Sequence, residues 1–289
     1  MRKIWVGVAF FAVLTVLLYG YLIWKNSVSV TTPGQAELET SLENSIQWVE
    51  QNRDAVLSNN NPMLWYMLQQ AADITGDQRL QRLFADYEQR YLKNHSNNLW
   101  RPLFYPGAWV PIRFKDISSF PYYNWHFLYA VTCDRELGQI AEITAQNEPA
   151  FCDSHPLRPG CVTHQMMGMR LLQRIKCGDT AKLDDTVRQL QRRIHKQLVL
   201  DPRVGDSYMQ RVLMLVESGA ANLVKPIWIR NLVDAQQPDG GWSAFQPLLP
   251  VGDGHAFGFS QRFFAIKKPH SDFHITAQGV LLFALLTHP

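Results

Sequence analysis

The sequence predicts an all-α fold, and three observations support that expectation. Apolar residues recur at the spacing of amphipathic helices, as in Leu80, Leu83, Phe84, Tyr87 and Tyr91. Glycines suited to helix ends recur at a nearly constant interval along the chain. Alternation of polar and apolar residues is scarce, and residues 257–266 are the one candidate strand.

The glycines divide the chain into pairs of helices. Gly138, Gly178 and Gly219 are 40 and 41 residues apart, and Gly76 lies 62 residues before the first of them. In each pair the first helix is apolar on most faces and the second is amphipathic, which is typical of stacked helical hairpins. The expected inner helices lie near 63–75, 126–137, 164–177, 207–218 and 274–287. The expected outer helices lie near 36–57, 77–93, 139–147, 180–199 and 224–236.

An inner ring of about five helices inside an outer layer is an α/α-toroid, expected here as one domain over residues 37–289. Residues 231–242 (NLVDAQQPDGGW) resemble the Q-x-x-D-G-G-W ending of outer helices in terpenoid cyclases and protein prenyltransferases. The resemblance implies a fold rather than a chemistry, because toroids host unrelated activities. The D-x-D-D acid motif and the zinc ligands of those families have no clear counterpart, and residues 239–242 are expected to be structural.

The N-terminal segment predicts a membrane anchor. Residues 4–24 are 21 consecutive uncharged residues, enough for roughly 30 Å of helix and therefore for the hydrocarbon core of a bilayer. A cleaved signal peptide has a shorter apolar run, of about 7–15 residues. Arg2 and Lys3 predict that residues 1–3 are cytoplasmic, that residues 25–36 form a tether and that the following domain is periplasmic or otherwise extracytoplasmic. The lipid bilayer is thus an expected partner.

Composition and charge limit the classes of partner that the chain can bind. The 289 residues are 46% hydrophobic and 18% charged, which excludes a disordered chain. The net charge is +3, and three basic residues flank the apolar segment, so 25 basic and 25 acidic residues remain elsewhere. A neutral body disfavours nucleic acid as a partner.

Four cysteines allow two disulfides in an oxidising compartment. The favoured pair is Cys152–Cys161, across a proline-rich loop. Cys161 also begins a C-x-x-H spacing with His164 that occurs in zinc sites, but no second close pair accompanies it. We therefore predict no metal site and no cofactor.

Polar residues begin the expected inner helices, and His126, His164, Asp206 and His274 among them are the candidate catalytic residues. Asn61, His126, His164 and Asp206 lie 12 to 15 residues before a turn glycine, and His274 begins the last helix. Parallel inner helices would bring these residues to one end of the ring. His126, His164 and His274 are candidate general acids or bases, with Asp206 or Asp272 as the carboxylate partner. The alternative is that such residues are ordinary helix caps.

Two aromatic loops, 98–127 and 243–273, are expected to lie over the same end of the ring. Aromatic faces beside histidine, aspartate and arginine are typical of a concave sugar site. The alternative is that these loops cap the ring or contact a partner. The candidate substrate-binding residues are Asn61, Trp109, Tyr122, Tyr123, His255, Arg262 and Asp272.

Three functional hypotheses follow from these patterns. The first is a membrane-anchored protein that binds or cleaves a glycan such as an envelope polysaccharide, as a glycoside hydrolase or a polysaccharide lyase. The second is a non-catalytic scaffold within a membrane complex. The third is polyisoprenoid or prenyl chemistry, which depends on the Q-x-x-D-G-G-W resemblance alone.

Overall fold

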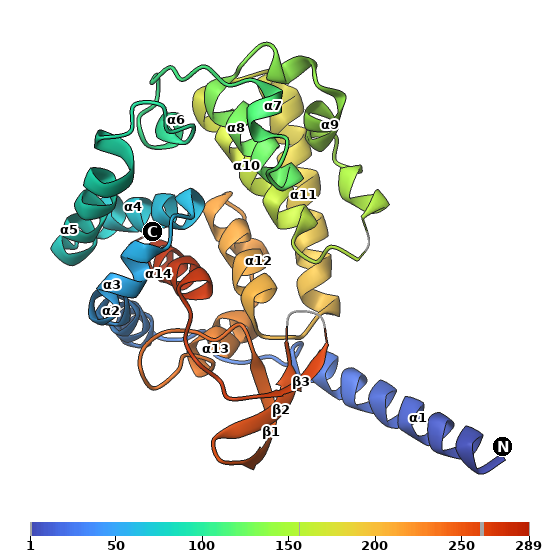
Figure 1. Cartoon of the computed structure of the whole chain (residues 1–289). Helices are drawn as coiled ribbons and strands as arrows, with labels where there is room; N and C mark the ends of the chain where they lie inside the picture. The colour runs from blue at the N-terminus through green and yellow to red at the C-terminus, as the bar shows by residue number, and fades with distance from the viewer. Residues whose placement is uncertain (1, 156, 261–262, 289) are drawn as a thin grey trace.

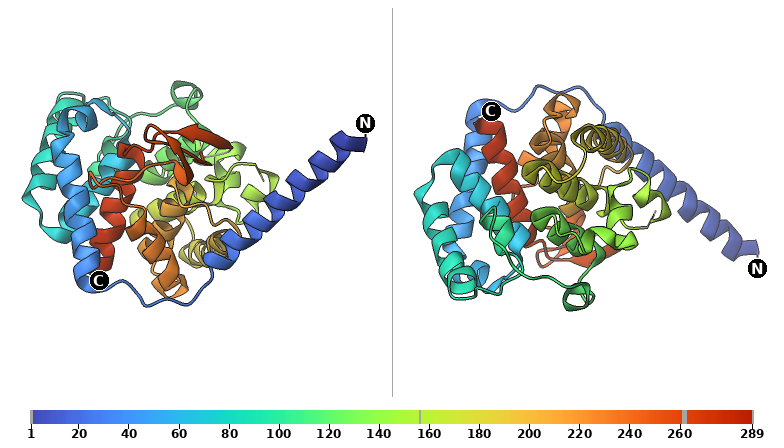
Figure 2. Two further views of the ribbon diagram at one scale, coloured as in Figure 1. Left: turned by 90° about the horizontal axis from the view of Figure 1, so that it is seen from below. Right: turned by 90° about the horizontal axis from the view of Figure 1, so that it is seen from above.

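The computed structural model describes residues 2–155, 157–260 and 263–288, without the side chains of residues 2–12 and 14. Helix α1 (Arg2–Lys25) projects from a largely helical body, and a small sheet lies on one side of that body (Figures 1 and 2). The last helix of the described chain, α14 (Phe273–Thr287), lies beside helices that come from the first third of the chain (Figures 1 and 2).

The sheet shows that the predicted fold class, an all-α α/α-toroid, is wrong. Strands β1 (Gln246–Gly252), β2 (His255–Phe259) and β3 (Phe264–Lys267) form an antiparallel sheet in that order. A two-residue turn, Asp253-Gly254, joins β1 to β2, and both residues have positive φ as a hairpin turn of this length requires. Prolines 247 and 250 weakened the strand signal of β1, but an edge strand accepts proline.

The predicted membrane anchor is also wrong. Within the described part of the chain, no helix has both the length and the apolar character needed to cross a bilayer. The C-terminal part of α1 contacts the body, where the Tyr19 hydroxyl donates a 2.9 Å hydrogen bond to the Leu200 carbonyl. The next residue after the helix, Asn26, is buried and donates to the Leu198 carbonyl at 2.7 Å. This corrects the single-pass membrane localisation that residues 4–24 had suggested.

Five apolar helices form the centre of the body. In spatial order, each neighbour packing on the next, they are α4 (Pro62–Thr75), α14 (Phe273–Thr287), α12 (Asp206–Glu217), α10 (Cys161–Ile175) and α8 (Tyr122–Thr132). Twelve of the fifteen residues of α14 are buried, because α2, α4 and α12 all pack against it. Helix α14 thus packs the end of the described chain against helices from its first part.

Amphipathic helices and short turns cover this centre. The longer ones are α2 (Gln35–Gln51), α3 (Arg53–Ser58), α5 (Gln78–Tyr87), α11 (Thr180–Leu200) and α13 (Pro226–Asp234), and a π-helical segment, Glu88–Lys93, continues α5. The short ones are α6 (Arg101–Phe104), α7 (Phe114–Ile117) and α9 (Ala141–Thr144), with 3₁₀ turns at Leu137–Gln139, Ala145–Asn147, Phe151–Ser154 and Ala221–Leu223. The outer helix expected at 139–147 is therefore a series of turns.

Two disulfides hold the α8–α10 region. Cys152 pairs with Cys161, which confirms the predicted pair, and Cys133 pairs with Cys177. The first closes the loop that leads into α10, and the second joins the end of α8 to the residues after α10. A helical body with two disulfides fits an oxidising environment.

The DGGW segment has a packing role. The Trp242 side chain is buried, stacks on Phe283 at 5.3 Å between ring centroids, and donates from its indole nitrogen to the Leu232 carbonyl at 2.8 Å. A side chain at Gly279 would come within 2.5 Å of the Trp242 ring, so glycine is needed on that face of α14. Asp239 accepts a 3.1 Å bond from the Trp48 indole nitrogen of α2.

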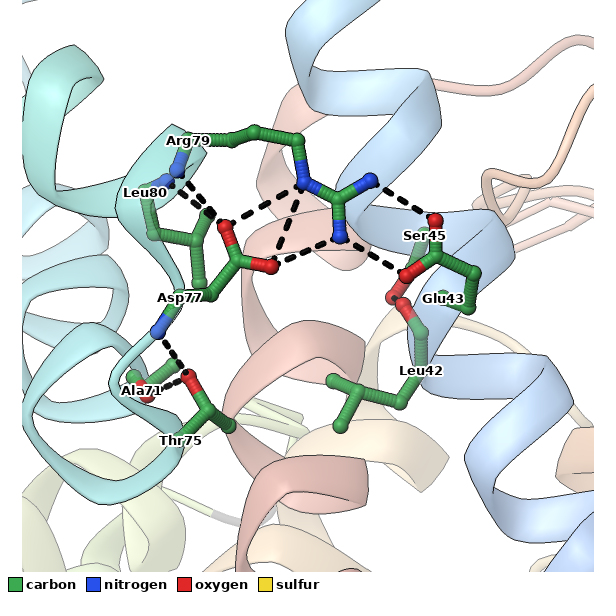
Figure 3. Close-up of polar contacts among 8 residues, drawn as sticks. All are labelled: Leu42, Glu43, Ser45, Ala71, Thr75, Asp77, Arg79 and Leu80. Atoms are coloured by element: carbon green, nitrogen blue, oxygen red, sulfur yellow. Dashed lines mark hydrogen bonds and ion pairs between the residues drawn. The ribbon is translucent and has the colours of Figure 1, made fainter.

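The turn between α4 and α5 joins three helices through one aspartate. Gly76 ends α4 with φ of 68°, a conformation that favours glycine. Asp77 then caps α5 by accepting from the backbone amides of Arg79 and Leu80 at 2.7 and 3.2 Å (Figure 3). The Arg79 guanidinium bonds both Asp77 and Glu43 of α2 (Figure 3), and the bonds to Glu43 are both 2.7 Å long.

Replacing the cap tests how much this turn stabilises the fold. We expect Asp77→Ala to lower the free energy of unfolding by about 1 kcal/mol, or roughly 2–4 °C in Tm, because two backbone amides lose their acceptor. Asp77→Asn keeps the cap and loses only the charge, so it should cost less than half as much. Thermal and urea unfolding measure both variants. An Asn variant as unstable as the Ala variant would show that the ion pair, and not the cap, is the stabilising interaction.

Candidate functional site

A cavity of about 550 Å³ lies where the five central helices begin. Each of α4, α8, α10, α12 and α14 contributes residues from its N-terminal half, so the five helices start at one end of the body. We call this space the amide cavity because Asn and Gln are the most numerous polar residues of its lining. Its lining residues are Asn60, Asn61, Pro62, Met63, Leu64, Met67, Asn97, Asn98, Leu99, Trp100, Phe120, Tyr123, Asn124, Phe127, His164, Met167, Gln210, His274 and Gln278.

The polar part of this lining is nearly uncharged, and apolar side chains such as Met63, Met67 and Met167 make up much of the rest. It includes seven Asn or Gln side chains, four aromatic rings and two histidines. No Lys, Arg, Asp or Glu belongs to the lining as far as the structure describes it. An amide offers both donors and an acceptor, so the cavity suits a ligand whose own groups do the same.

His164 is fixed in one tautomer by the loop before α10. Its Nδ1 lies 2.6 Å from the Gly160 carbonyl oxygen, which can only accept, so Nδ1 carries the proton and Nε2 has a free lone pair. The imidazole stacks on the Tyr123 ring, with centroids 4.2 Å apart. Burial lowers the pKa of His164, although the Gly160 bond and the nearby Asp206 charge oppose that shift. The ring is therefore neutral at pH 7 and offers an acceptor.

His274 lies beside a carboxylate behind the cavity wall. Its Nε2 is 3.3 Å from Asp206 Oδ1, and the imidazole is 46% exposed. Gln278 also donates to Asp206 Oδ1, at 2.9 Å. Asp206 thus holds two lining side chains in place without lining the cavity itself.

Gln278 carries an unused acceptor. The residue is fully buried and lines the cavity, and its Oε1 has no hydrogen-bond partner among the described residues. A buried carbonyl oxygen without a partner costs about 1–3 kcal/mol unless water or a ligand donates to it. Gln210, also buried, is occupied differently, since its Oε1 accepts from Thr163 and its Nε2 lies 3.7 Å from the Met167 sulfur.

Four of the predicted site residues meet at this cavity. Asn61, Tyr123, His164 and His274 line it, and Asp206 supports His274 from behind. Asn61 is also the N-cap of α4, accepting from the Met63 amide at 3.1 Å, so the cap alternative holds for that residue as well.

His126 and Tyr122 do not line the amide cavity. His126 is completely buried, with Nε2 2.8 Å from Asn147 Oδ1 and with Nδ1 lacking a partner among the described residues. It packs against Gly168 of α10, where a methyl group would collide with the imidazole. Tyr122 lies parallel to the His155 ring at 5.9 Å and has the Arg158 guanidinium 4.8 Å from its ring centre.

The remaining predicted residues lie outside the lining. Trp109 is 82% exposed in the loop between α6 and α7, and His255 is exposed at the start of β2. Asp272 caps α14 by accepting from the Ile275 amide at 3.2 Å. Arg262 lies outside the described residues.

Sequence reasoning missed the amides that give the cavity its character. Asn98 and Asn124 belong to the aromatic segment 98–127, Asn97 lies directly before it, and Gln210 and Gln278 lie inside helices. The available signal was helical spacing. Gln210 and Gln278 each lie four residues after a helix-start residue, Asp206 and His274, and therefore on the same face as that residue.

Comparison with known proteins yields no relative. No family model, no curated protein and no solved structure matches this chain. The resemblance of residues 231–242 to toroid proteins therefore stays a prediction. Within the described residues, no group of three or more His, Cys, Asp or Glu is placed to hold a metal ion. Cys161 is in a disulfide, so the C-x-x-H pair lacks a free thiolate.

The buried His126 should make stability depend on pH. Burial lowers its pKa to about 4 in the folded chain, against an ordinary value near 6.5 after unfolding. The unfolded state then binds more protons between these values, so this contribution to stability is complete above pH 6.5 and is lost as the pH falls toward 4. From pH 7 to pH 5 we expect a loss of about 2 kcal/mol from this group.

Urea unfolding at pH 7 and pH 5 measures this loss. The control is His126→Gln, which keeps a polar side chain there and removes the titration. The wild-type chain should lose about 2 kcal/mol more than the variant between these pH values. Equal losses in the two chains would contradict a buried neutral His126.

Proposed function

We propose that this chain binds a neutral, hydroxyl-rich ligand of the glycan class in the amide cavity. One observation carries the proposal: seven amides, four aromatic rings and two histidines line one cavity of about 550 Å³ without a Lys, Arg, Asp or Glu among its described lining residues. That volume is within the range of ligand sites. A scaffold needs no such cavity.

Two features of the lining favour a sugar as the ligand. A sugar hydroxyl both donates and accepts, and so do Asn and Gln side chains, which makes a ring of amides a natural match. The rings of Trp100 and Tyr123, both half-buried, offer flat apolar surface of the kind that contacts the C–H face of a sugar. Gln278 lines the cavity, and its oxygen has no partner among the described residues, so this side chain has an acceptor left for a ligand hydroxyl.

Cleavage of the bound glycan is a second candidate, favoured by the state of His164. Its Nε2 lone pair can accept a proton from a hydroxyl group or a water molecule, as a general base does. His274, held beside Asp206, supplies a second group able to transfer a proton. Asp206 would act through His274 as a positioning residue.

Binding tests the first proposal. We expect the full chain to bind a subset of glycans on an array, and His164→Ala to weaken that binding about tenfold because one hydrogen-bond acceptor and one stacked ring are lost. His255→Ala, which changes an exposed histidine outside the cavity, is the matched control and should bind like the wild type. Absence of binding in every chain, or equal binding by His164→Ala and the control, would contradict the proposal.

An assay of product release tests the second proposal, cleavage of the glycan. With a glycan that binds, we expect new chain ends to form in the wild type and their rate to fall about 10²-fold or more in His164→Ala and in His274→Ala. Because the pKa of His164 is lowered, the rate should hold on the acid side below pH 6.5 before it declines. Binding without product in the wild type would leave a binding protein and exclude the cleavage proposal.

A further inference from the structure

A second cavity, of about 690 Å³, lies on the other side of α10 and has the opposite chemistry. We call it the basic cavity because four arginines line it: Arg158, Arg193, Arg203 and Arg211. The loop closed by the Cys152–Cys161 disulfide forms one wall. No described residue lines both this cavity and the amide cavity.

The basic cavity has an excess of positive charge. Asp201 is shared by two guanidinium groups, with Arg203 Nε at 2.6 Å and Arg211 NH1 at 2.9 Å. Arg193 pairs with Asp153. Arg158 has no carboxylate partner among the described residues, and its guanidinium lies over the Tyr122 ring. Four guanidinium groups therefore face two carboxylates.

Two buried polar atoms of this lining have no partner. The Arg211 side chain is only 4% exposed, and its Nε donor is not hydrogen-bonded within the described structure. Gln197 Oε1, an acceptor, is buried and unpartnered as well. An unpaired buried donor on a charged group costs more than a neutral one, so an acceptor that reaches the Arg211 Nε would stabilise this lining.

We propose that the basic cavity binds an oxyanion that also carries a hydroxyl group. The oxyanion would accept from the Arg211 Nε and be held by the unneutralised charge of Arg158, since guanidinium groups bind carboxylate and phosphate oxygens strongly. The hydroxyl group would donate to Gln197 Oε1. Hydrogen phosphate, a sugar phosphate ester and a uronic acid all have this pair of groups, whereas sulfate lacks the donor.

This inference does not depend on the function proposed for the amide cavity, because the two linings share no residue. Phosphate binding that persists in His164→Ala would separate the two sites. Conversely, an unoccupied amide cavity would leave the argument for the basic cavity unchanged.

Calorimetric titration of the full chain tests the proposal with four probes: inorganic phosphate, glucuronate, sulfate and neutral glucose. We expect phosphate or glucuronate to bind one per chain, with an affinity that falls as salt is added. Tighter binding of phosphate would point to a phosphate group in the natural ligand, and tighter binding of glucuronate to a carboxylate. Sulfate should bind about tenfold more weakly because it cannot donate to Gln197.

Charge-matched variants locate the site. Arg211→Lys keeps the charge and removes the Nε donor, and Arg158→Gln removes an exposed charge that lies over the Tyr122 ring and has no described carboxylate partner. Each should weaken phosphate or glucuronate binding about tenfold. Arg188→Gln, on the exposed face of α11, removes the same charge outside the cavity and should bind like the wild type.

Several outcomes would overturn the inference. Failure of both phosphate and glucuronate to bind would do so, as would wild-type affinity in Arg158→Gln, which stays informative if Arg211→Lys does not fold. Glucose that binds as tightly as glucuronate would exclude an anion site. Sulfate as tight as phosphate would contradict the role given to Gln197.

Discussion

The burial of α14 is the constraint on which the rest of the structure depends. This last helix lies between α4 and α12 and against α2. Helices from the first part of the chain and from its later part therefore bury it together. The helix must therefore be apolar almost all round, and one neighbour must be able to approach closely, which Gly279 permits beneath Trp242. Once α14 is seated, its first turns complete the amide cavity with His274 and Gln278.

Much of the helical framework could be predicted because helices depend on local spacing. Gly76-Asp77 and Gly178-Asp179 lie where one helix ends and the next begins, as expected, whereas Gly138 lies in a 3₁₀ turn beyond the end of α8. The sheet could not be predicted as easily, since β1 contains two prolines and pairs only with β2. Its local signals were the Asp253-Gly254 turn and the candidate strand at 257–266, which covers parts of β2 and β3. The hydropathy of residues 4–24 had indicated an anchor, but in the described part of the chain no helix combines the length and the apolar character that a bilayer span needs.

The site residues at the starts of helices could be predicted from the sequence. The direction in which each side chain points could not. His164 and His274 were identified from their repeat positions, and both line the cavity. His126 occupies an equivalent position in sequence, yet its ring fills the space left by Gly168 of the neighbouring helix. The amides were missed because each is unremarkable alone, and the neutral character of the site arises only from their assembly.

The Cys152–Cys161 disulfide has a consequence for both cavities. It forms a wall of the basic cavity, and it also fixes the loop whose last residue, Gly160, accepts from His164 Nδ1. This one bond therefore helps to fix the wall beside the arginines on one side of α10. It also helps to fix the carbonyl group that sets the tautomer of His164 on the other side. The two cavities differ in charge, in lining and in expected ligand, yet both cysteines of this pair line one of them and the neighbouring Gly160 bonds a histidine of the other.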